Sequence, residues 1–275
     1  MKLIRFSNGL RTQLGEVDGE QVYVISGSDT MTMNDVLRRN IMPNRVSLSH
    51  SLAQVKVLAP LRPGKIIAIG RNYAEHAKET GSDIPKAPII FAKFSSSVIA
   101  PGEEITWSKS ITNEVDWEGE LAVIIGKKGR NISEEDAYNH IYGYTIANDV
   151  SARDLQLRTD SQWTRGKSLD TFCPMGSYIV TRDEIEDPQN LNIKTMVNDE
   201  VMQESNTKNM IFNIRHLIAY CSQMFTLEPG DVILTGTPDG VGEGMNPKRY
   251  LQDGDVVKIT IDGLGELSNP VKVTE

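Results

Sequence analysis

The chain has 275 residues, of which 39% are hydrophobic and 24% charged, and its 37 acidic and 29 basic residues give a formal charge of −8. This acidic balance argues against a nucleic-acid partner, because binding to a phosphate backbone requires basic patches. Cys173 and Cys221 are too few for a disulfide scaffold and too far apart for a metal or redox motif, which favours a cytoplasmic location. No apolar stretch approaches the roughly 20 residues that span a bilayer, so we expect no membrane anchor.

The first sixty residues have the pattern of a small β-rich unit. Alternating apolar and polar residues indicate short strands at 3–6, 11–17 and 21–25. The dipeptides Asn8-Gly9 and Asp18-Gly19 favour tight hairpins between these strands. Thr32 and Asp35 match a capping box, in which two side chains satisfy free amides at a helix start, and they predict a brief helix through Arg39.

A connector separates this unit from the rest of the chain. Residues 59–64 contain two prolines and a glycine, which interrupt regular structure. We therefore place a domain boundary near residue 60, between a small N-terminal domain over 1–60 and a larger domain over 61–275.

The larger region is predicted to consist mainly of strands. Asn72 and Glu75 match a second capping box and predict a helix of barely two turns that Gly81 ends. One amphipathic pattern predicts a longer helix over 209–225. Further strands are predicted at 65–69, 118–125, 141–147, 177–180, 193–197, 231–235 and 256–261. The expected fold class is α+β with an extensive, partly antiparallel sheet.

Acidic residues fall on every second position from Glu114 through Asp116 and Glu118 to Glu120, which places them on one face of a strand. We interpret Glu114 and Asp116 as a solvated strand edge. Glu118 and Glu120 differ, because the strand continues into 121–125, which is apolar on both faces and is expected to be buried. Carboxylates at the rim of a buried strand need a cation, and Mg²⁺ prefers oxygen ligands.

A further acidic residue, Asp149, follows one predicted strand and precedes a predicted helix. Ser151 and Asp154 match the capping box of that helix, which leaves Asp149 free of the capping role. The spacing fits a third metal ligand and an ordinary turn residue equally well. Arg153 and Gln156 lie three positions apart on one helix face, where they either orient a carboxylate or lie in solvent.

His76 and Glu79 also lie three positions apart on a predicted helix. A carboxylate beside an imidazole is typical of a general base tuned towards neutral pH. The spacing alone fits an incidental surface pair better.

Two loops contain residues that suit anion binding. Gly166-Lys167-Ser168 resembles the end of a phosphate loop, but Ser161 stands where that motif requires glycine, which excludes it. Lys167 is then either a cation near developing negative charge or a surface residue. Thr237 lies in the glycine-rich segment 235–244, whose free N–H groups either bind a carboxylate or belong to a flexible hairpin.

Taken in chain order, these segments resemble the fumarylacetoacetate hydrolase family of metal-dependent 2-oxo acid enzymes. The resemblance runs from about residue 65 to the C-terminus. It rests on Gly70-Arg71-Asn72-Tyr73 leading to His76 and Glu79, on Glu118-Gly119-Glu120-Leu121, on the segment from Asn148 to Gln156, on Gly166-Lys167-Ser168 and on Thr235-Gly236-Thr237-Pro238.

The resemblance implies a mixed β-sandwich roll, a homodimer and one Mg²⁺ or Mn²⁺ ion per subunit. It implies roles for ten residues: the metal ligands Glu118, Glu120 and Asp149, the catalytic residues His76, Glu79 and Lys167, and the substrate contacts Arg71, Arg153, Gln156 and Thr237.

These expectations lead to a hydrolase or lyase that cleaves a carbon–carbon bond in a small 2-oxo acid, such as an acylpyruvate, fumarylpyruvate or oxaloacetate, and releases a pyruvate enolate. An isomerase or tautomerase of an unsaturated 2-oxo dioate is the alternative, because it uses the same metal without attack by water. A non-catalytic 2-oxo acid binding protein, in which the metal only stabilises the sheet, is the alternative from another class.

Overall fold

The computed structural model describes residues 1–159 and 161–275. Strands dominate these residues, as expected. The strands are β1 (Lys2–Ser7), β2 (Thr12–Asp18), β3 (Gln21–Ile25), β4 (Arg45–Ser51), β5 (Lys56–Leu58), β6 (Ile66–Gly70), β7 (Ile89–Lys93), β8 (Val98–Ile99), β9 (Ile105–Ser108), β10 (Val115–Asp116), β11 (Gly119–Ile125), β12 (Ile141–Asn148), β13 (Ser151–Ala152), β14 (Cys173–Thr181), β15 (Asn192–Val197), β16 (Glu200–Asn206), β17 (Val232–Leu234), β18 (Val256–Ile261) and β19 (Gly265–Thr274). The α-helices are α1 (Met33–Arg39), α2 (Ala74–Glu79), α3 (Thr164–Lys167) and α4 (Ile214–Met224), and a π-helical turn spans Asp154–Arg158.

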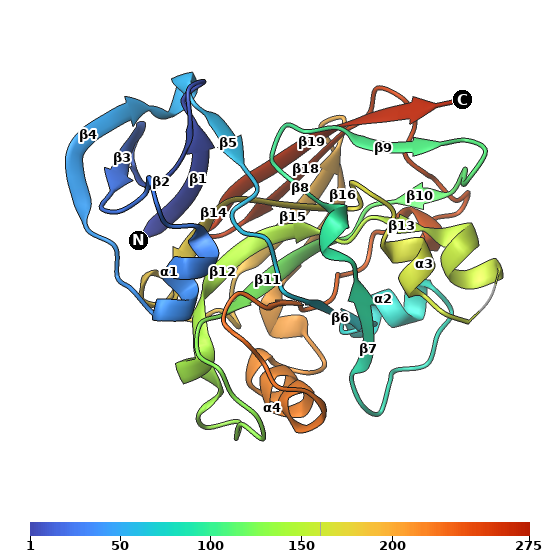
Figure 1. Cartoon of the computed structure of the whole chain (residues 1–275). Coiled ribbons are helices and arrows are strands. Elements are labelled where there is room, and N and C mark those ends of the chain that lie inside the picture. The colour runs from blue at the N-terminus through green and yellow to red at the C-terminus, as the bar shows by residue number, and fades with distance from the viewer. Residues whose placement is uncertain (160) are drawn as a thin grey trace.

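Two mixed sheets form the body of the molecule (Figure 1). The 12-stranded sheet has the order β4-β3-β2-β1-β14-β12-β11-β17-β6-β7, with β5 beside β1 and β8 beside β14, and the five-stranded sheet has the order β16-β15-β18-β19-β9. One hydrophobic core contains Leu121 and Ile146 of the large sheet together with Ile193 and Ile259 of the smaller one. The sheets therefore bury apolar faces against each other, which confirms the β-rich α+β fold.

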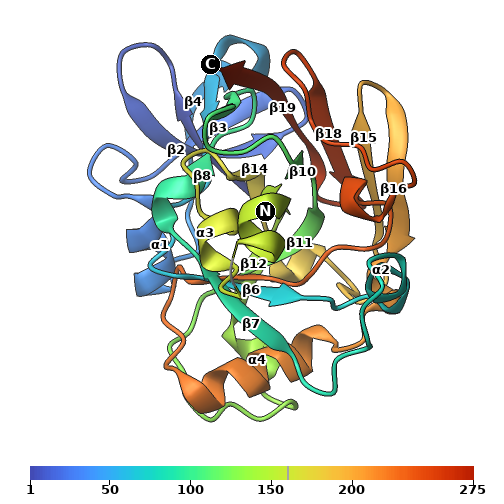
Figure 2. The same ribbon diagram turned by 90° about the vertical axis from the view of Figure 1, so that its right-hand side faces the viewer.

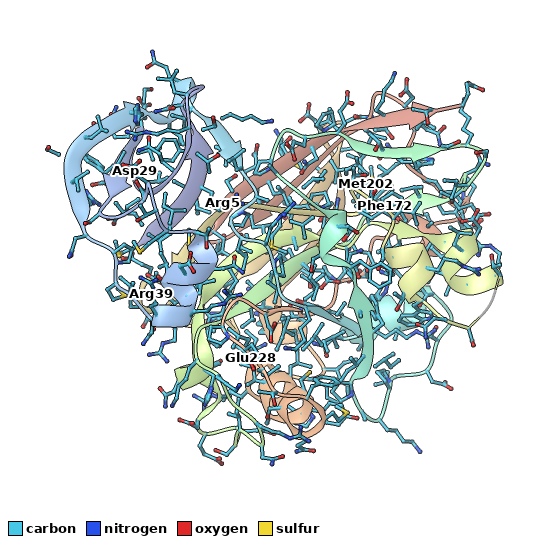
Figure 3. The ribbon with its side chains drawn as sticks, in the orientation of Figure 1. Arg5, Asp29, Arg39, Phe172, Met202 and Glu228 are labelled. Atoms are coloured by element: carbon cyan, nitrogen blue, oxygen red, sulfur yellow. The ribbon has the colours of Figure 1, made fainter. Side chains whose placement is uncertain are left out.

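The N-terminal strands are joined to the large sheet, because β1 pairs antiparallel with β14. Figure 3 labels Arg5 between these strands and the rest of the molecule, and its Nη1 donates to the Ala59 carbonyl at 2.7 Å. The predicted strands and hairpins at 3–25 are present, whereas β4 and β5 were not predicted. A domain boundary near residue 60 stays a prediction.

The helix predicted after Thr32 is α1, and its capping box is confirmed. The Asp35 amide donates to the Thr32 hydroxyl at 3.2 Å, and the Thr32 amide donates back to the Asp35 carboxylate at 2.9 Å. Met33, Val36 and Leu37 form the buried face of the helix.

Replacing Thr32 with alanine is expected to lower the free energy of unfolding by about 1 kcal/mol, because one helix-end amide loses its partner. Denaturant unfolding measures the change. Thr30→Ala is the control, since Thr30 is exposed in the preceding turn and caps no helix. Equal midpoints for the two variants would show that the cap contributes nothing.

Two other predicted capping boxes are wrong. Helix α2 is present, but its N-cap is Tyr73, and the buried side chain of Asn72 instead bonds the Phe212 and Thr235 backbones. Ser151 lies in β13, where its hydroxyl donates to the Asp149 carbonyl. The Asp154 carboxylate accepts from the Thr112 hydroxyl, 42 positions earlier in the chain. In both places a long-range partner outcompetes the local cap.

Helix α4 is shorter than predicted and begins at Ile214, because the side chain of Asn213 accepts from the His216 amide and caps it there. No helix in the described ranges is long and apolar enough to cross a membrane.

Candidate metal and substrate site

Strand pairing brings three of the predicted acidic residues together. In the antiparallel pair β11–β12, Gly119 lies opposite Asn148, so Glu118 and Asp149 both sit where the paired strands end. The Asp149 amide donates to the Glu118 carbonyl at 2.9 Å. Glu118, Glu120 and Asp149 are all buried, and each offers an oxygen within 4.8 Å of the other two. The sequence pattern thus corresponds to a real cluster of carboxylates.

Buried cations pair with two of these carboxylates. Lys167 Nζ donates to Glu118 at 2.7 Å and to Asp149 at 3.0 Å, and Arg153 Nη1 lies 2.8 Å from Glu118. Lys93 Nζ donates to the other Asp149 oxygen at 2.6 Å. Burial opposes the ionisation of Glu118, but Lys167 and Arg153 outweigh it and lower the pKa of Glu118 to about 2.

Glu120 differs from its two neighbours. It accepts from the Gly236 amide at 2.8 Å, but no ion pair joins it to a basic side chain in the described parts of the chain. Burial, together with the charges of Asp149 and Glu118, raises the pKa of Glu120 well above its ordinary range. A buried acidic group without a cation is unfavourable, and a divalent ion that prefers oxygen ligands removes the imbalance. The residues present therefore fit Mg²⁺ or Mn²⁺.

Sequence reasoning missed Lys93. Its side chain on β7 is fully buried, and it also donates to the Val150 and Lys167 carbonyls. One sequence signal could have identified Lys93. It is the single lysine within the apolar run 89–94, and it lies two residues after Phe91 and therefore on the same strand face.

A cavity of about 110 Å³ opens onto this cluster. Its lining includes Ile69, Gly70, Arg71, His76, Thr80, Ser82, Phe91, Glu118, Arg153, Gln156, Leu157, Trp163, Lys167, Thr237 and Glu243. The contributing helices α2 and α3 lie at the end of the molecule that faces the viewer in Figure 2. Seven of the ten predicted site residues line the cavity directly. Of the other three, Glu79 contacts His76, and Glu120 and Asp149 cluster with Glu118.

The predicted pair of His76 and Glu79 is formed. His76 Nδ1 lies 2.8 Å from Glu79 Oε1, and both side chains are largely buried. The second Glu79 oxygen accepts from the Gly240 amide at 2.8 Å. A neutral His76 that donates from Nδ1 keeps its lone pair on Nε2, at the cavity lining, which is the arrangement of an oriented general base.

Arg71 also lines the cavity. Its guanidinium lies 5.4 Å from the centre of the Trp163 ring, a cation–π contact, and Arg71 has a positive φ of 55°. Trp163 packs so closely on Gly70 that a Cβ there would lie 2.4 Å from the ring. Trp163 was not predicted as a site residue, and it holds a cation at the cavity.

Three amides of the glycine-rich segment bind the protein's own carboxylates. Gly236 donates to Glu120, Gly240 to Glu79, and Gly242 to Asp116, each at 2.8 Å. The Thr237 hydroxyl donates to the Gly119 carbonyl at 3.0 Å. The protein's own carboxylates thus order the segment, so it is not a flexible hairpin.

Asp116 is buried, so its predicted position on a solvated edge is wrong. Strand β10 ends at Asp116 and pairs with β13, where Asp116 lies opposite Ser151, and Arg153 just after β13 donates from Nε to the Asp116 carboxylate at 2.8 Å. Burial raises the pKa of Asp116, and Arg153 and backbone amides oppose that effect. Glu114 is partly exposed and forms an ion pair with Arg158.

Both cysteines are buried and free, and burial raises the pKa of Cys173 and Cys221 to about 12. Such thiols are protonated at neutral pH and are therefore poor nucleophiles.

The sequence is similar to those of known proteins. The sequence pattern of the family described as fumarylacetoacetate (FAA) hydrolase C-terminal matches residues 65–272. Oxaloacetate tautomerase fahd2, a mitochondrial protein of Xenopus laevis, is 52% identical over 223 residues, which cover 80% of this chain and 70% of the relative.

Solved structures share the whole fold. The fumarylacetoacetate hydrolase from Exiguobacterium antarcticum superimposes with a TM-score of 0.88 at 40% identity and covers 99% of both chains. Maleylpyruvate hydrolase from Sphingobium, solved with manganese(II) and pyruvate, superimposes with a TM-score of 0.80 at 32% identity over 100% of both chains.

Proposed function

This chain belongs to the fumarylacetoacetate hydrolase family, and from that premise we propose that it catalyses the keto–enol tautomerisation of a small 2-oxo dicarboxylic acid such as oxaloacetate. The observation that carries the proposal is that His76, paired with Glu79, lines the same small cavity as Glu118 of the carboxylate cluster. A relative that is 52% identical is named for this reaction.

We propose that Glu118, Glu120 and Asp149 hold one Mg²⁺ or Mn²⁺ ion. When bound, the ion would supply Lewis-acid polarisation of the 2-oxo group and a template for the adjoining carboxylate. The support is the buried Glu120, which no basic side chain in the described ranges neutralises, and a relative of 32% identity was solved with manganese(II).

We assign proton transfer, charge stabilisation and carboxylate binding to side chains around the cavity. We assign to His76 Nε2 the proton transfer at C3 of the substrate, with Glu79 holding the imidazole in orientation through Nδ1. Lys167 places a positive charge where negative charge develops on the substrate oxygen. Arg153 and Arg71 supply two further cations for carboxylates.

Gln156 and Thr237 complete the proposed substrate contacts. Gln156 Oε1 accepts from Arg153 at 2.9 Å, and Thr237 accepts from the buried Gln203 side chain at 2.8 Å. Both side chains line the cavity. These hydrogen bonds hold them in fixed orientations there.

The size and charge of the cavity favour a short dianion. Its volume of about 110 Å³ lies well below the roughly 300–1,000 Å³ of pockets for drug-sized ligands. Arg71, Arg153 and Lys167 line it together. A four-carbon acid with two carboxylates suits these features better than a long acylpyruvate.

Cleavage of a carbon–carbon bond in a 2-oxo acid, by hydrolysis or decarboxylation, is the second candidate. The specific observation in its favour is the 2.8 Å contact between His76 and Glu79, because an oriented base of this kind also activates water. A hydrolase solved with pyruvate shares the fold.

Product analysis separates the two reactions. With Mg²⁺ and enol oxaloacetate, we expect the enol absorbance to decay faster with protein than without it. NMR should identify the product as intact keto oxaloacetate. A chelator should abolish the acceleration. Pyruvate appearing at the rate of enol loss would favour cleavage, and no acceleration of either reaction would contradict both candidates.

We also propose that the protein acts as a cytoplasmic homodimer. The support for the cytoplasm is the pair of free, buried cysteines, which do not need an oxidising compartment. The homodimer rests on family membership alone, and its mass in solution by light scattering tests it.

A further inference from the structure

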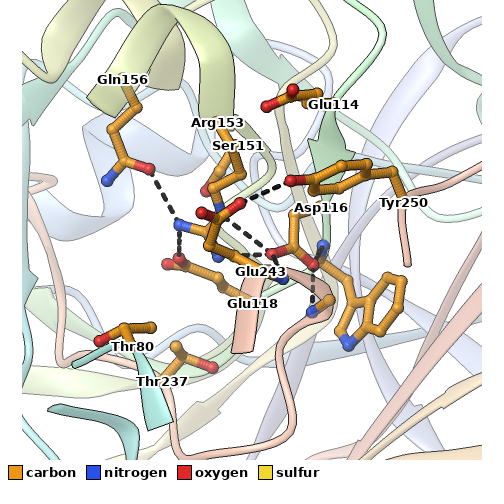
Figure 4. Close-up of polar contacts among 12 residues, drawn as sticks. Thr80, Glu114, Asp116, Glu118, Ser151, Arg153, Gln156, Thr237, Glu243 and Tyr250 are labelled. Carbon is orange, nitrogen blue, oxygen red and sulfur yellow. Dashed lines mark hydrogen bonds and ion pairs between the residues drawn. The ribbon is translucent and has the colours of Figure 1, made fainter. Parts of the chain in front are cut away.

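Asp116 is a carboxylate beside the cavity that accepts four hydrogen bonds. It is 0% exposed. One oxygen accepts from the amides of Trp117 and Gly242 at 2.8 Å each, and the other accepts from the Glu243 amide at 2.9 Å and from Arg153 Nε at 2.8 Å (Figure 4). Asp116 therefore joins three segments that are far apart in the sequence.

Through Arg153, Asp116 reaches the substrate cavity. Arg153 is only 3% exposed, and its Nη1 donates to Gln156 and lies 2.8 Å from Glu118. Its Nη2 lies 2.8 Å from Asp116, but no hydrogen bond of good geometry satisfies it within the described ranges. The guanidinium that Asp116 contacts thus belongs to a side chain that lines the cavity.

Asp116 also fixes one wall of the cavity through the glycine-rich segment. A Cβ at Gly242 would lie 1.8 Å from the Arg249 carbonyl, so only glycine lets the two backbone segments approach this closely. The next residue, Glu243, lines the cavity, and its carboxylate accepts from Tyr250 at 2.6 Å. The amides that Asp116 binds are thus those that place Glu243.

We propose that Asp116 is a positioning residue of the 2-oxo acid site, which holds the Arg153 guanidinium from behind so that it meets the substrate carboxylate. It takes no part in proton transfer and does not touch the substrate. The inference rests on the proposed function in one respect, namely that Arg153 binds a carboxylate of the substrate.

Oxalate binding in the presence of Mn²⁺ tests the inference without turnover. In Asp116→Asn, Arg153 keeps Glu118 but loses the carboxylate that holds its Nε and Nη2. We expect oxalate affinity measured by calorimetry to fall about 10–100-fold, as for other residues that orient a ligand-binding side chain. Affinity for Mn²⁺ alone should stay within about threefold, because Lys167 still pairs with Glu118. In turnover, KM for oxaloacetate should rise more than kcat falls.

Asp231→Asn is the matched control. Asp231 is also buried, accepts from the Glu228 amide and pairs with a lysine, Lys65, but it does not line the cavity. Both variants are expected to lose stability, and only Asp116→Asn should lose oxalate affinity. Unchanged oxalate affinity in folded Asp116→Asn would overturn the inference alone, whereas wild-type protein that binds no oxalate would overturn both the inference and the proposed function.

A second comparison applies even if Asp116→Asn does not fold. Replacing Arg153 with methionine together with Asp116→Asn removes both buried charges, which is tolerated better than removing one. The double variant should bind oxalate as weakly as Arg153→Met alone, because Asp116 then has no guanidinium to hold. A further tenfold loss in the double variant would show that Asp116 does not act through Arg153.

Discussion

Replacing Glu120 with glutamine is expected to remove most of the activity while leaving the metal-free protein at least as stable as before. Glu120 is the member of the carboxylate cluster that forms no ion pair with a basic side chain in the described ranges, although the charge of Lys167 acts on it from farther away. In the metal-free protein, burial and the charges of Asp149 and Glu118 oppose ionisation of Glu120 and raise its pKa. Glutamine removes the ionisable group, and with it this unfavourable burial, and keeps an oxygen for the Gly236 amide.

In Glu120→Gln, kcat/KM should therefore fall while the free energy of unfolding of the metal-free protein rises. We expect kcat/KM of Glu120→Gln to fall by at least about 10³-fold, since loss of metal-ion catalysis removes several kcal/mol of transition-state stabilisation. The free energy of unfolding without metal should rise by about 0.5–2 kcal/mol, as when a functional but unfavourable charge is removed. Wild-type protein should gain about 2.7 kcal/mol at a Mn²⁺ concentration 100 times its Kd, and the variant far less.

Glu118→Gln is the matched comparison, because it removes a carboxylate from the same cluster. Glu118 already has Lys167 and Arg153 as partners. Removing one partner from a buried ion pair leaves the other charge unsatisfied, so this variant should lose both activity and metal-free stability. If Glu120→Gln destabilises the metal-free protein as much as Glu118→Gln does, the charge balance inferred for the cluster is wrong.

Local sequence signals predicted the elements and turns well, because they act over a few residues. The capping box of Thr32 and Asp35 was found this way, as was the alternation that leads to Glu118 and Glu120. The same reasoning failed at Asn72, whose local match to a cap was correct in spacing but whose side chain bonds the backbone of Phe212, 140 positions away. A single sequence gives no measure of such distant competitors.

The same limit explains the residues of the site that were missed or misread. Asp116 belongs to a strand of two residues whose pairing with β13 carries it under Arg153, 37 positions later. Its alternation with Glu114 looks like that of a solvated edge until the pairing is known. Lys93 and Trp163 likewise depend on how β7 and α3 pack over the carboxylate cluster. Residue type and spacing pointed to Glu118 and Glu120, and the family resemblance added Asp149, whereas the side chains that support this cluster require the fold.

Replacing His76 with asparagine is expected to lower kcat by about 10²–10⁴-fold, the usual contribution of a general acid or base. The asparagine amide can still donate to Glu79 from the position of Nδ1, so the change removes mainly Nε2, the atom we assign to proton transfer. Affinities for Mn²⁺ and oxalate should remain within about threefold, because His76 is not one of the three clustered acidic residues.

His216→Asn provides the control, since His216 Nδ1 also lies 2.8 Å from a glutamate, Glu134, but on an exposed surface. Its turnover should equal that of the wild type. If His76 and Glu79 act as one unit, adding Glu79→Gln to His76→Asn should lower kcat little further, because residues that work together lose their contribution only once. Full turnover by His76→Asn would instead mean that another group moves the proton, and Lys167, which lines the same cavity, is then the residue to replace next.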